Sequence, residues 1–95
     1  MNSDFFDWDD ANISHIAEHD VSPEEAEQVL LGDSLEIDFD VANGEERWTY
    51  IGETNVARIL TVVFTTRNEH MRVITAFSPS PLRMRIYLEW RAQQS

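Results

Sequence analysis

The sequence predicts an α+β fold in which helices precede and follow a four-stranded antiparallel sheet. The chain has 95 residues, of which 42% are hydrophobic and 11% aromatic, so we expect residues 1–95 to form a single domain. The apolar spacing is helical before Ser34, alternates through Phe77, and becomes helical again from Ser80. Helices that flank a run of consecutive strands are typical of the α+β class.

A first helix is expected close to the N-terminus. Asp9 or Asp10 is suited to cap it, because a short carboxylate side chain accepts hydrogen bonds from the free N–H groups of a first turn. The helix should run through Glu18 and turn Ile13 and Ile16 toward the core.

A second helix is predicted from the segment Ser22-Pro23-Glu24-Glu25. Serine is a favoured N-cap, proline fits the first helical position, and Glu25 completes a capping box with Ser22. The inner face of this helix should carry three apolar residues, namely Ala26, Val29 and Leu30.

Four strands follow, and their spacing predicts consecutive hairpins. The predicted bounds are Leu35–Asp40, Arg47–Glu53, Arg58–Thr66 and Met71–Phe77. The first strand alternates apolar and acidic residues, which favours an edge position with one face in water. The third strand is apolar on both faces and therefore belongs near the centre of the sheet. Asn43-Gly44, at the first reversal, is typical of a two-residue hairpin turn.

A last helix should restart at Ser80-Pro81. The positions i, i+4 and i+8 predict that its inner face carries Leu82, Ile86 and Trp90, with a neighbouring stripe of Arg83, Tyr87 and Arg91. We expect one core that combines this helix with the strands, built from Trp48 or Tyr50, Val62 or Val63, Ile74 and Ile86.

Cysteine usage and hydropathy exclude several classes of protein. The chain has no cysteine, which excludes disulfides, thiolate zinc sites and cysteine nucleophiles. Its longest uncharged apolar run, Ile59 to Phe64, is too short to cross a bilayer, and the acidic start lacks the basic flank of a signal peptide. We therefore expect a cytoplasmic protein with no membrane contact.

Charge is divided unevenly along the chain, whose net charge is −11. Residues 1–46 hold fifteen acids and no base, whereas residues 47–95 hold all seven arginines and three acids. The acidic total disfavours non-specific binding to nucleic acid, but the second half retains the arginines needed for a local phosphate site. A further interpretation is that the acidic half imitates nucleic acid.

Several strings, taken in order, resemble the BrnT toxins of bacterial type II toxin–antitoxin pairs, in the RelE/ParE-like group. They are Phe6-Asp7-Trp8-Asp9, His19 and Val21 before the serine-led helix, Gly44-Glu45-Glu46-Arg47 leading into Tyr50-Ile51-Gly52, and Arg72-Val73-Ile74-Thr75-Ala76 before a helix with Arg85 and Tyr87. The resemblance implies a RelE-like fold and a metal-independent endoribonuclease that inhibits translation. It also implies a ribbon-helix-helix antitoxin, similar to BrnA, as protein partner.

Metal-independent cleavage of RNA needs a base, an acid and cations at the phosphate. His19 is our candidate acid or base, because imidazole titrates near neutral pH. Arg47 and Arg72 are candidates for holding the phosphate, and Tyr87 for donating a hydrogen bond to it. Three arginines of the last helix are candidate RNA contacts, namely Arg83, Arg85 and Arg91. We expect no cofactor and no metal ion, since His15 and His19 lack a third ligand in register.

Each candidate also has an ordinary structural interpretation. His19 would satisfy the end of the first helix, Arg72 would be buried against a carboxylate, and Tyr87 would be a packed helix residue. The family usually has Arg-Lys-His-Gly where this chain has Ala17-Glu18-His19-Asp20. The loss of these cations favours, as the alternative function, a catalytically degenerate module that binds an antitoxin or another protein.

Overall fold

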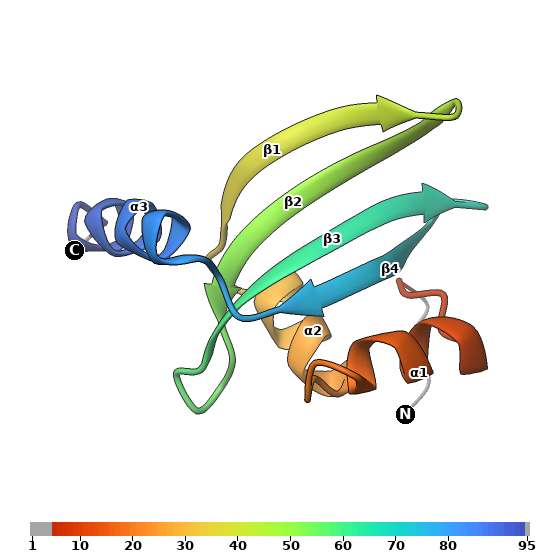
Figure 1. Cartoon of the computed structure of the whole chain (residues 1–95), viewed down its shortest axis with the longest axis horizontal. Coiled ribbons are helices and arrows are strands. Elements are labelled where there is room, and N and C mark those ends of the chain that lie inside the picture. The colour runs from red at the N-terminus through yellow and green to blue at the C-terminus, as the bar shows by residue number, and fades with distance from the viewer. Residues whose placement is uncertain (1–4, 95) are drawn as a thin grey trace.

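The computed structural model describes residues 5–94. Along the chain, two helices precede a four-stranded sheet and one helix follows it (Figure 1). The elements are α1 (Asp10–Ala17), α2 (Pro23–Leu31), β1 (Leu35–Ala42), β2 (Glu45–Glu53), β3 (Ile59–Arg67), β4 (His70–Phe77) and α3 (Pro81–Ala92). The strand order is β1-β2-β3-β4, and every neighbouring pair is antiparallel. The predicted α+β class, the edge position of β1 and the inner position of β3 are therefore confirmed.

The helix starts follow from local hydrogen bonds. The Asp9 side chain accepts from the backbone N–H groups of Ala11 and Asn12, and the Asn12 side chain accepts from the backbone of Asp9. Ser22 and Glu25 form the predicted reciprocal capping box at the start of α2. These bonds satisfy N–H groups that a helix leaves unpaired at its first turn.

Two tight hairpins set the register of the sheet. The β1–β2 turn places Asn43 and Gly44 at φ values of 55° and 77°, and the β3–β4 turn places Asn68 and Glu69 at 53° and 67°. Two successive left-handed residues make a turn whose twist matches that of the strands. Each hairpin therefore pairs its strands directly from the turn onward, which fixes the side chains that share a face.

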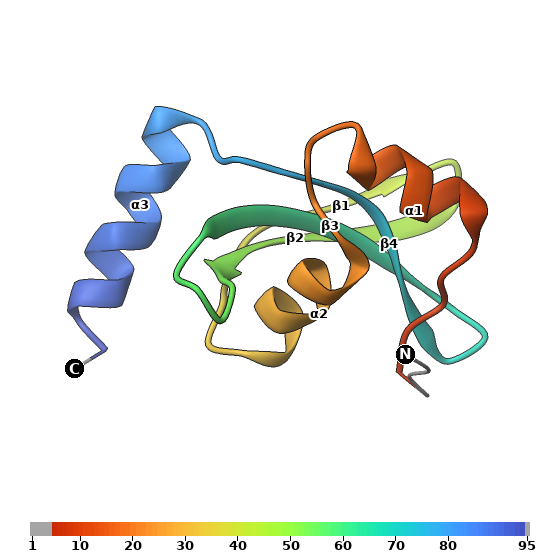
Figure 2. The same ribbon diagram turned by 90° about the horizontal axis from the view of Figure 1, so that it is seen from below.

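One face of the sheet packs against α1 and α2. The core packs strands β3 and β4 against the two helices and their connection. The strands contribute Leu60, Val62, Val73 and Ala76, and the helical segment contributes Ile16, Val21, Ala26 and Val29. Gly52 lies where α2 comes close to the sheet, since a Cβ there would come within 3.1 Å of Val29. Figure 2 shows α1 and α2 against the sheet and α3 at its far end.

The outer edge of β4 is covered by the N-terminal segment. Phe6 forms a parallel bridge with Met71, and backbone hydrogen bonds join Asp7 N to Met71 O at 2.8 Å and Met71 N to Phe5 O at 2.7 Å. The Asn12 side chain donates to the carbonyl of Val73 at 3.1 Å. These bonds hold the start of α1 beside β4.

The structure corrects the predicted inner face of the last helix. Leu82 and Ile86 are 58% and 42% exposed, and Tyr87 is the fully buried side chain of α3. The helix is attached through Tyr87, whose hydroxyl donates to Glu53 at the end of β2, and this contact rotates the predicted face outward. The expectation that Ile86 belongs to the shared core is therefore wrong.

Other core expectations are confirmed in part. Val62 is fully buried as predicted, but Ile13 is 37% exposed and Ile74 is half-buried beside an irregularity in the β3–β4 pairing. Trp48 and Tyr50 are half-buried and form ring contacts with Phe64 instead of joining the cluster under the helices. The helices cover only part of the sheet, so apolar residues near the hairpin ends pack on one another.

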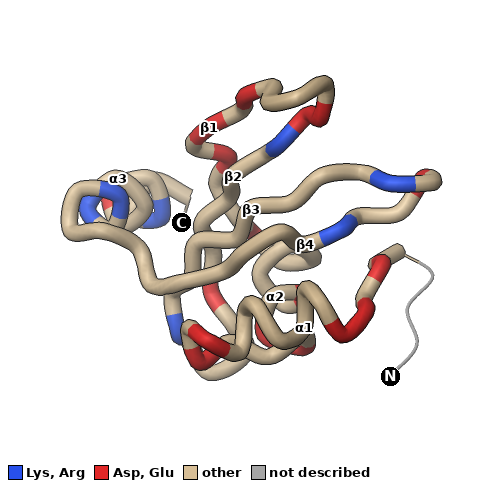
Figure 3. The backbone as a smooth tube through the Cα atoms, turned by 45° about the vertical axis from the view of Figure 1, so that its right-hand side comes forward, with Lys and Arg blue, Asp and Glu red and all other residues tan. Residues whose placement is uncertain are grey.

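Charges remain unevenly placed in three dimensions, with basic residues on α3 and near the hairpins (Figure 3). Acids dominate α1, α2 and β1. Within residues 5–94, no helix is both long enough and apolar enough to cross a membrane.

The core assignment predicts that Val62→Asp destabilises the protein severely. Val62 is fully buried, so an aspartate would place an unpaired charge in the interior at a cost of about 3 kcal/mol or more. Val56→Asp is the matched control, because Val56 is 82% exposed. Thermal unfolding followed by circular dichroism should show a large loss of Tm for Val62→Asp alone, and equal Tm values for the two variants would refute the assignment.

Candidate functional site

Arg47 and Arg72 lie on the same face of the sheet, opposite the core. Residues two apart on a strand share a face, as do residues directly opposite on neighbouring strands. Arg47 therefore shares a face with Thr49, which is opposite Val63 on β3. Two residues farther along β3, Thr65 is opposite Arg72 on β4. The strand register thus gives two arginines that are 25 positions apart in the chain the same face of the sheet.

A shallow cavity of about 290 Å³ lies where α1 borders β4. It is lined by residues of α1, β2 and β4: Ala11, Asn12, His15, Glu45, Arg72, Val73 and Ile74. The side chains with ionisable groups are His15, Arg72 and Glu45, so an imidazole and a guanidinium line the same cavity.

His19 lies in the turn after α1, at the other end of this border. Its ring centroid is 5.9 Å from that of His15 and 6.1 Å from that of Phe77. Phe77 is opposite Thr61 on β3, and Thr61 alternates with Val63, so Phe77 belongs to the arginine-bearing face. His19 therefore lies beside one residue of that face, although the helix that it follows packs on the opposite face.

Arg47 retains an unused donor. Its Nε lies 3.5 Å from Asp40 Oδ1, but this buried nitrogen has no hydrogen-bond partner among the described residues. This contact pairs Arg47 with Asp40 across the β1–β2 ladder. The hydroxyl of Thr61, on the same face, is likewise buried without a partner.

Arg72 is held by two carboxylates, as the structural interpretation of the sequence predicted. Its Nη2 lies 3.1 Å from Asp9 and its Nη1 lies 3.6 Å from Asp7, with the Arg72 side chain 16% exposed. The hydrogen bond from Arg72 holds the pKa of the Asp9 carboxyl below its usual value of 3.8. Arg72 is therefore positioned firmly, and its charge is partly neutralised.

Tyr87 is placed apart from the histidines, at the end of β2. Its hydroxyl donates to Glu53 Oε2 at 2.8 Å, and Arg91 Nε lies 3.5 Å from the same oxygen. Burial, followed by the hydrogen bond to Glu53, raises the pKa of Tyr87 to about 12. A phenol in this state donates a hydrogen bond but does not act as a base near neutral pH.

The other predicted RNA contacts of α3 differ in their pairing. Arg91 pairs with Glu53 and lies 4.0 Å from Asp33. Neither Arg83 nor Arg85 makes an ion pair within residues 5–94. These two guanidinium groups remain available to solvent or to a partner.

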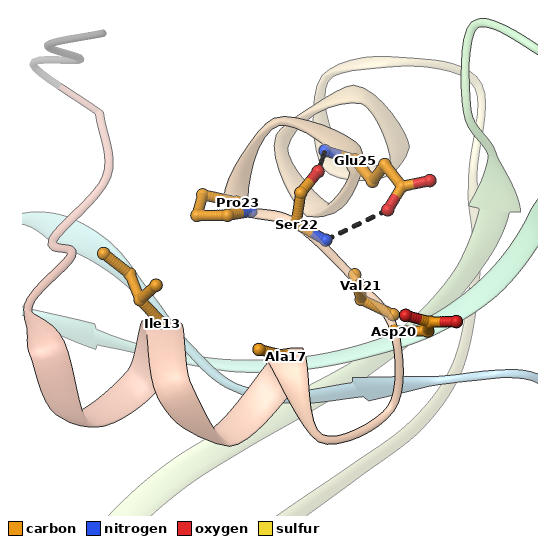
Figure 4. Close-up of a pocket in the computed structure, with 7 residues that line it drawn as sticks. All are labelled: Ile13, Ala17, Asp20, Val21, Ser22, Pro23 and Glu25. Atoms are coloured by element: carbon orange, nitrogen blue, oxygen red, sulfur yellow. Dashed lines mark hydrogen bonds between the residues drawn. The ribbon is translucent and has the colours of Figure 1, made fainter.

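A second cavity, of about 350 Å³, lies between α1 and α2 (Figure 4). It is lined by Ile13, Ala17, Asp20, Val21, Ser22, Pro23 and Glu25. Arg58 donates to Glu25 at 3.0 Å and to the carbonyl of Asp20 at 2.7 Å, which holds β3 against the start of α2. The lining carries two carboxylates and no cation, so its charge does not suit a phosphate.

From the sequence, we considered His15 only as a metal ligand together with His19, and not as an acid or base. No group of three or more His, Cys, Asp or Glu side chains able to hold a metal ion is found among residues 5–94. The signal that would have identified His15 is its i, i+4 spacing from His19, which brings the two side chains together at the end of one helix.

Comparison with protein families decides the assignment. A family model described as "Ribonuclease toxin, BrnT, of type II toxin-antitoxin system" matches residues 8–78, which is most of the chain. The chain belongs to the BrnT family. A comparison with curated proteins found no match. Its family makes this BrnT protein the ribonuclease toxin of a type II toxin–antitoxin system, with a protein antitoxin as partner.

The matched range divides the candidate residues. It contains His15, His19, Arg47 and Arg72. It ends before α3, which carries Tyr87 and the three arginines proposed as RNA contacts. The part of this BrnT protein shared with the family is therefore the part that builds the arginine-bearing face.

The contacts of Glu25 predict a defined pH dependence of stability. The backbone N–H of Ser22, together with Arg58, holds the pKa of Glu25 below its usual value of 4.5 despite partial desolvation. A lowered folded pKa means that the carboxylate stabilises the protein above pH 4.5 and that this stabilisation is lost as the pH falls through the folded pKa. Glu25→Gln should therefore lower Tm at pH 7 and reduce the further loss of Tm on acidification.

Glu24→Gln is the matched control, since Glu24 is exposed in the same turn and its side chain makes no hydrogen bond or ion pair among residues 5–94. Thermal unfolding at pH 7 and near pH 3 compares the variants. The assignment fails if Glu25→Gln and Glu24→Gln have the same Tm at both values.

Proposed function

We propose that this BrnT protein cleaves RNA without a metal ion on the sheet face that carries Arg47 and Arg72. The observation that supports this most directly is the strand register, which gives Arg47 and Arg72 the same face. His15 lines a cavity with Arg72, and the ring of His19 contacts that of His15. Cations beside imidazoles provide the groups needed for cleavage of a phosphodiester by its own 2′-hydroxyl.

The reaction forms a bond between the 2′-oxygen and phosphorus and breaks the bond between phosphorus and the 5′-oxygen. One imidazole, in its neutral form, accepts the proton of the 2′-hydroxyl. The other, in its protonated form, gives a proton to the departing 5′-oxygen. The products are a 2′,3′-cyclic phosphate and a 5′-hydroxyl, so the atoms and protons balance without water, oxidant or metal.

His19 and His15 are the pair we propose for these two steps. Their ring centroids are 5.9 Å apart and both side chains are exposed, so substrate has access to both. The ordinary pKa of imidazole lies close to neutral pH, where the neutral and protonated forms coexist. Two such groups beside one phosphate supply a base and an acid at the same pH.

The two arginines would stabilise the charge that develops on the phosphate. To reach a phosphate, Arg47 would have to turn away from Asp40, and Arg72 would have to exchange a carboxylate for the phosphate. Each exchange costs binding energy, and the acidic N-terminal half repels RNA across a Debye length of about 8 Å. We therefore expect slow cleavage of RNA in general, and faster cleavage of an RNA that makes additional favourable contacts with the protein.

Tyr87 has a different task in this proposal. Its buried hydroxyl is committed to Glu53, so it secures α3 to the sheet instead of contacting the phosphate. Arg85 is exposed and Arg83 half-buried, and neither is ion-paired among residues 5–94, so both could bind the RNA backbone beyond the scissile bond, whereas Arg91 is partly neutralised by Glu53. RNA binding by α3 would therefore add affinity without taking part in the reaction.

We propose a ribbon-helix-helix protein similar to BrnA as the antitoxin, and the cytoplasm as the compartment. The family supports a protein antitoxin, and the resemblance of several strings to BrnT toxins supports this type. A cysteine-free chain is suited to a reducing compartment, where RNA substrates are present.

The proposal predicts that His19→Ala slows RNA cleavage by about 10² to 10⁴ and Arg72→Ala by about 10² to 10³. His70→Ala is the matched control, because His70 begins β4 at the hairpin turn and its ring contacts the carbonyl of Asn68. Cleavage of a generic RNA should continue in a chelator and yield the cyclic phosphate.

Circular dichroism spectra establish that each variant remains folded. Full activity of both His19→Ala and Arg72→Ala would exclude this face as the site while leaving the family assignment intact. Absence of cleavage by the unaltered protein, combined with tight binding of an antitoxin, would favour the catalytically degenerate alternative.

A further inference from the structure

A second arginine of the β3–β4 hairpin reaches the carboxylate that pairs with Arg72. Arg67 Nε lies 3.8 Å from Asp7 Oδ2, and Arg72 Nη1 lies 3.6 Å from the same oxygen. Figure 3 shows the basic positions near the end of this hairpin and the acidic segment before α1 on the same side of the molecule. Two guanidinium groups that converge on one anionic oxygen have the arrangement with which arginines bind a phosphate.

The strand register places Arg67 on the arginine-bearing face. Arg67 and Thr65 are two apart on β3, and Thr65 is opposite Arg72 on β4. The side chain of Arg67 is 57% exposed, against 16% for Arg72. Arg67 therefore extends this face toward the hairpin turn, with a guanidinium group that a ligand can reach from solvent.

The carboxylate of Asp7 holds the two arginines loosely. Charge-assisted hydrogen bonds from a guanidinium group to a carboxylate are about 2.7–2.9 Å long, and both contacts of Asp7 Oδ2 are longer than this. Asp7 is also the only ion-pair partner of Arg67 within residues 5–94. A phosphodiester has two non-bridging oxygens, so it could accept a short hydrogen bond from each arginine.

We propose that Arg67 and Arg72 together bind a phosphodiester of RNA, and that the Asp7 carboxylate occupies this phosphate site until RNA displaces it. This inference rests on the function proposed above, to which it adds a binding residue and an internal competitor of the substrate. The backbone of Asp7 is held independently of its side chain, because its N–H donates to Met71 O at 2.8 Å and its carbonyl accepts from Asn12 Nδ2 at 3.0 Å. The carboxylate can therefore turn away while the segment stays beside β4.

Binding of an RNA that cannot be cleaved tests this site separately from catalysis. The probe is a short fluorescent RNA with 2′-O-methyl groups and no terminal phosphate, titrated with protein and followed by fluorescence anisotropy. Asp7→Asn should tighten binding about twofold to fivefold, which is the range expected when an exposed ion pair no longer competes. Arg67→Ala should weaken binding by a similar factor and lower the slope of log affinity against log salt by about one.

Asp10→Asn is the matched control. It removes a negative charge from the same part of the chain, but Asp10 is exposed and makes no ion pair among residues 5–94. Its effect on RNA affinity should be clearly smaller than that of Asp7→Asn. In the Arg67→Ala background, Asp7→Asn should gain less affinity than in the unaltered chain, because one of the two arginines that it releases is missing.

Circular dichroism spectra show whether each variant is folded. The inference is overturned if Asp7→Asn binds the RNA no more tightly than Asp10→Asn, or if Arg67→Ala binds as tightly as the unaltered chain. It is also overturned if neither the unaltered chain nor Asp7→Asn binds the RNA at low salt. Displacement of the RNA by a polyglutamate peptide as readily as by unlabelled RNA would assign the site to an acidic protein segment instead.

These outcomes are separate from those that test the proposed reaction. Cleavage that requires His19 and Arg72 but is unchanged in Arg67→Ala and Asp7→Asn would leave the proposed function standing and remove the two-arginine phosphate site.

Discussion

The ion pair between Asp9 and Arg72 links the first helix to the sheet, and the candidate site depends on it. Asp9 caps α1 through backbone N–H groups and also accepts a hydrogen bond from Arg72 on β4. Asn12, one turn into the helix, binds the carbonyl of Val73 on the same strand. Through these contacts the direction of α1 is fixed relative to β4, so that His15 lines a cavity with Arg72 and His19 lies beside His15.

The same contact carries a functional cost. A carboxylate that positions an arginine also neutralises it, so Arg72 reaches a phosphate only by releasing Asp9 or Asp7. The charge of Arg47 is neutralised less strongly, because its Nε lies near Asp40 without a hydrogen bond. The site is thus well ordered before substrate binds but has little free positive charge. An acidic chain with such a site is suited to selective, slow cleavage more than to indiscriminate binding of RNA.

The features that the sequence predicted well are those decided by neighbours in the chain. The capping box of Ser22 and Glu25 and the turn at Asn43-Gly44 involve residues within three positions of one another, and both are present in the structure. The α+β order follows from periodicity, which is also local. The sequence also allowed that Arg72 faces a carboxylate, and the structure pairs it with Asp7 and Asp9, just before α1.

The features that the sequence missed depend on contacts between distant residues. The inner face of α3 is set by the bond of Tyr87 to Glu53, 34 positions away, and helical spacing does not reveal which stripe such a bond will bury. The pairing of Arg47 with Asp40 depends on the hairpin register. The closeness of His15 to Arg72 depends on how α1 docks on β4. These three contacts determine which candidate residues share a site.

The most direct test of this account is to locate bound RNA by NMR. A short RNA with 2′-O-methyl groups cannot attack its own phosphates, so it stays intact during a titration of the labelled protein. The account predicts that the largest shift changes fall on Thr49, Thr65, Arg72 and His19, with little change at Trp48 on the opposite face. Shift changes concentrated on Trp48 and its ring neighbours, with none at Arg72 or His19, would contradict it.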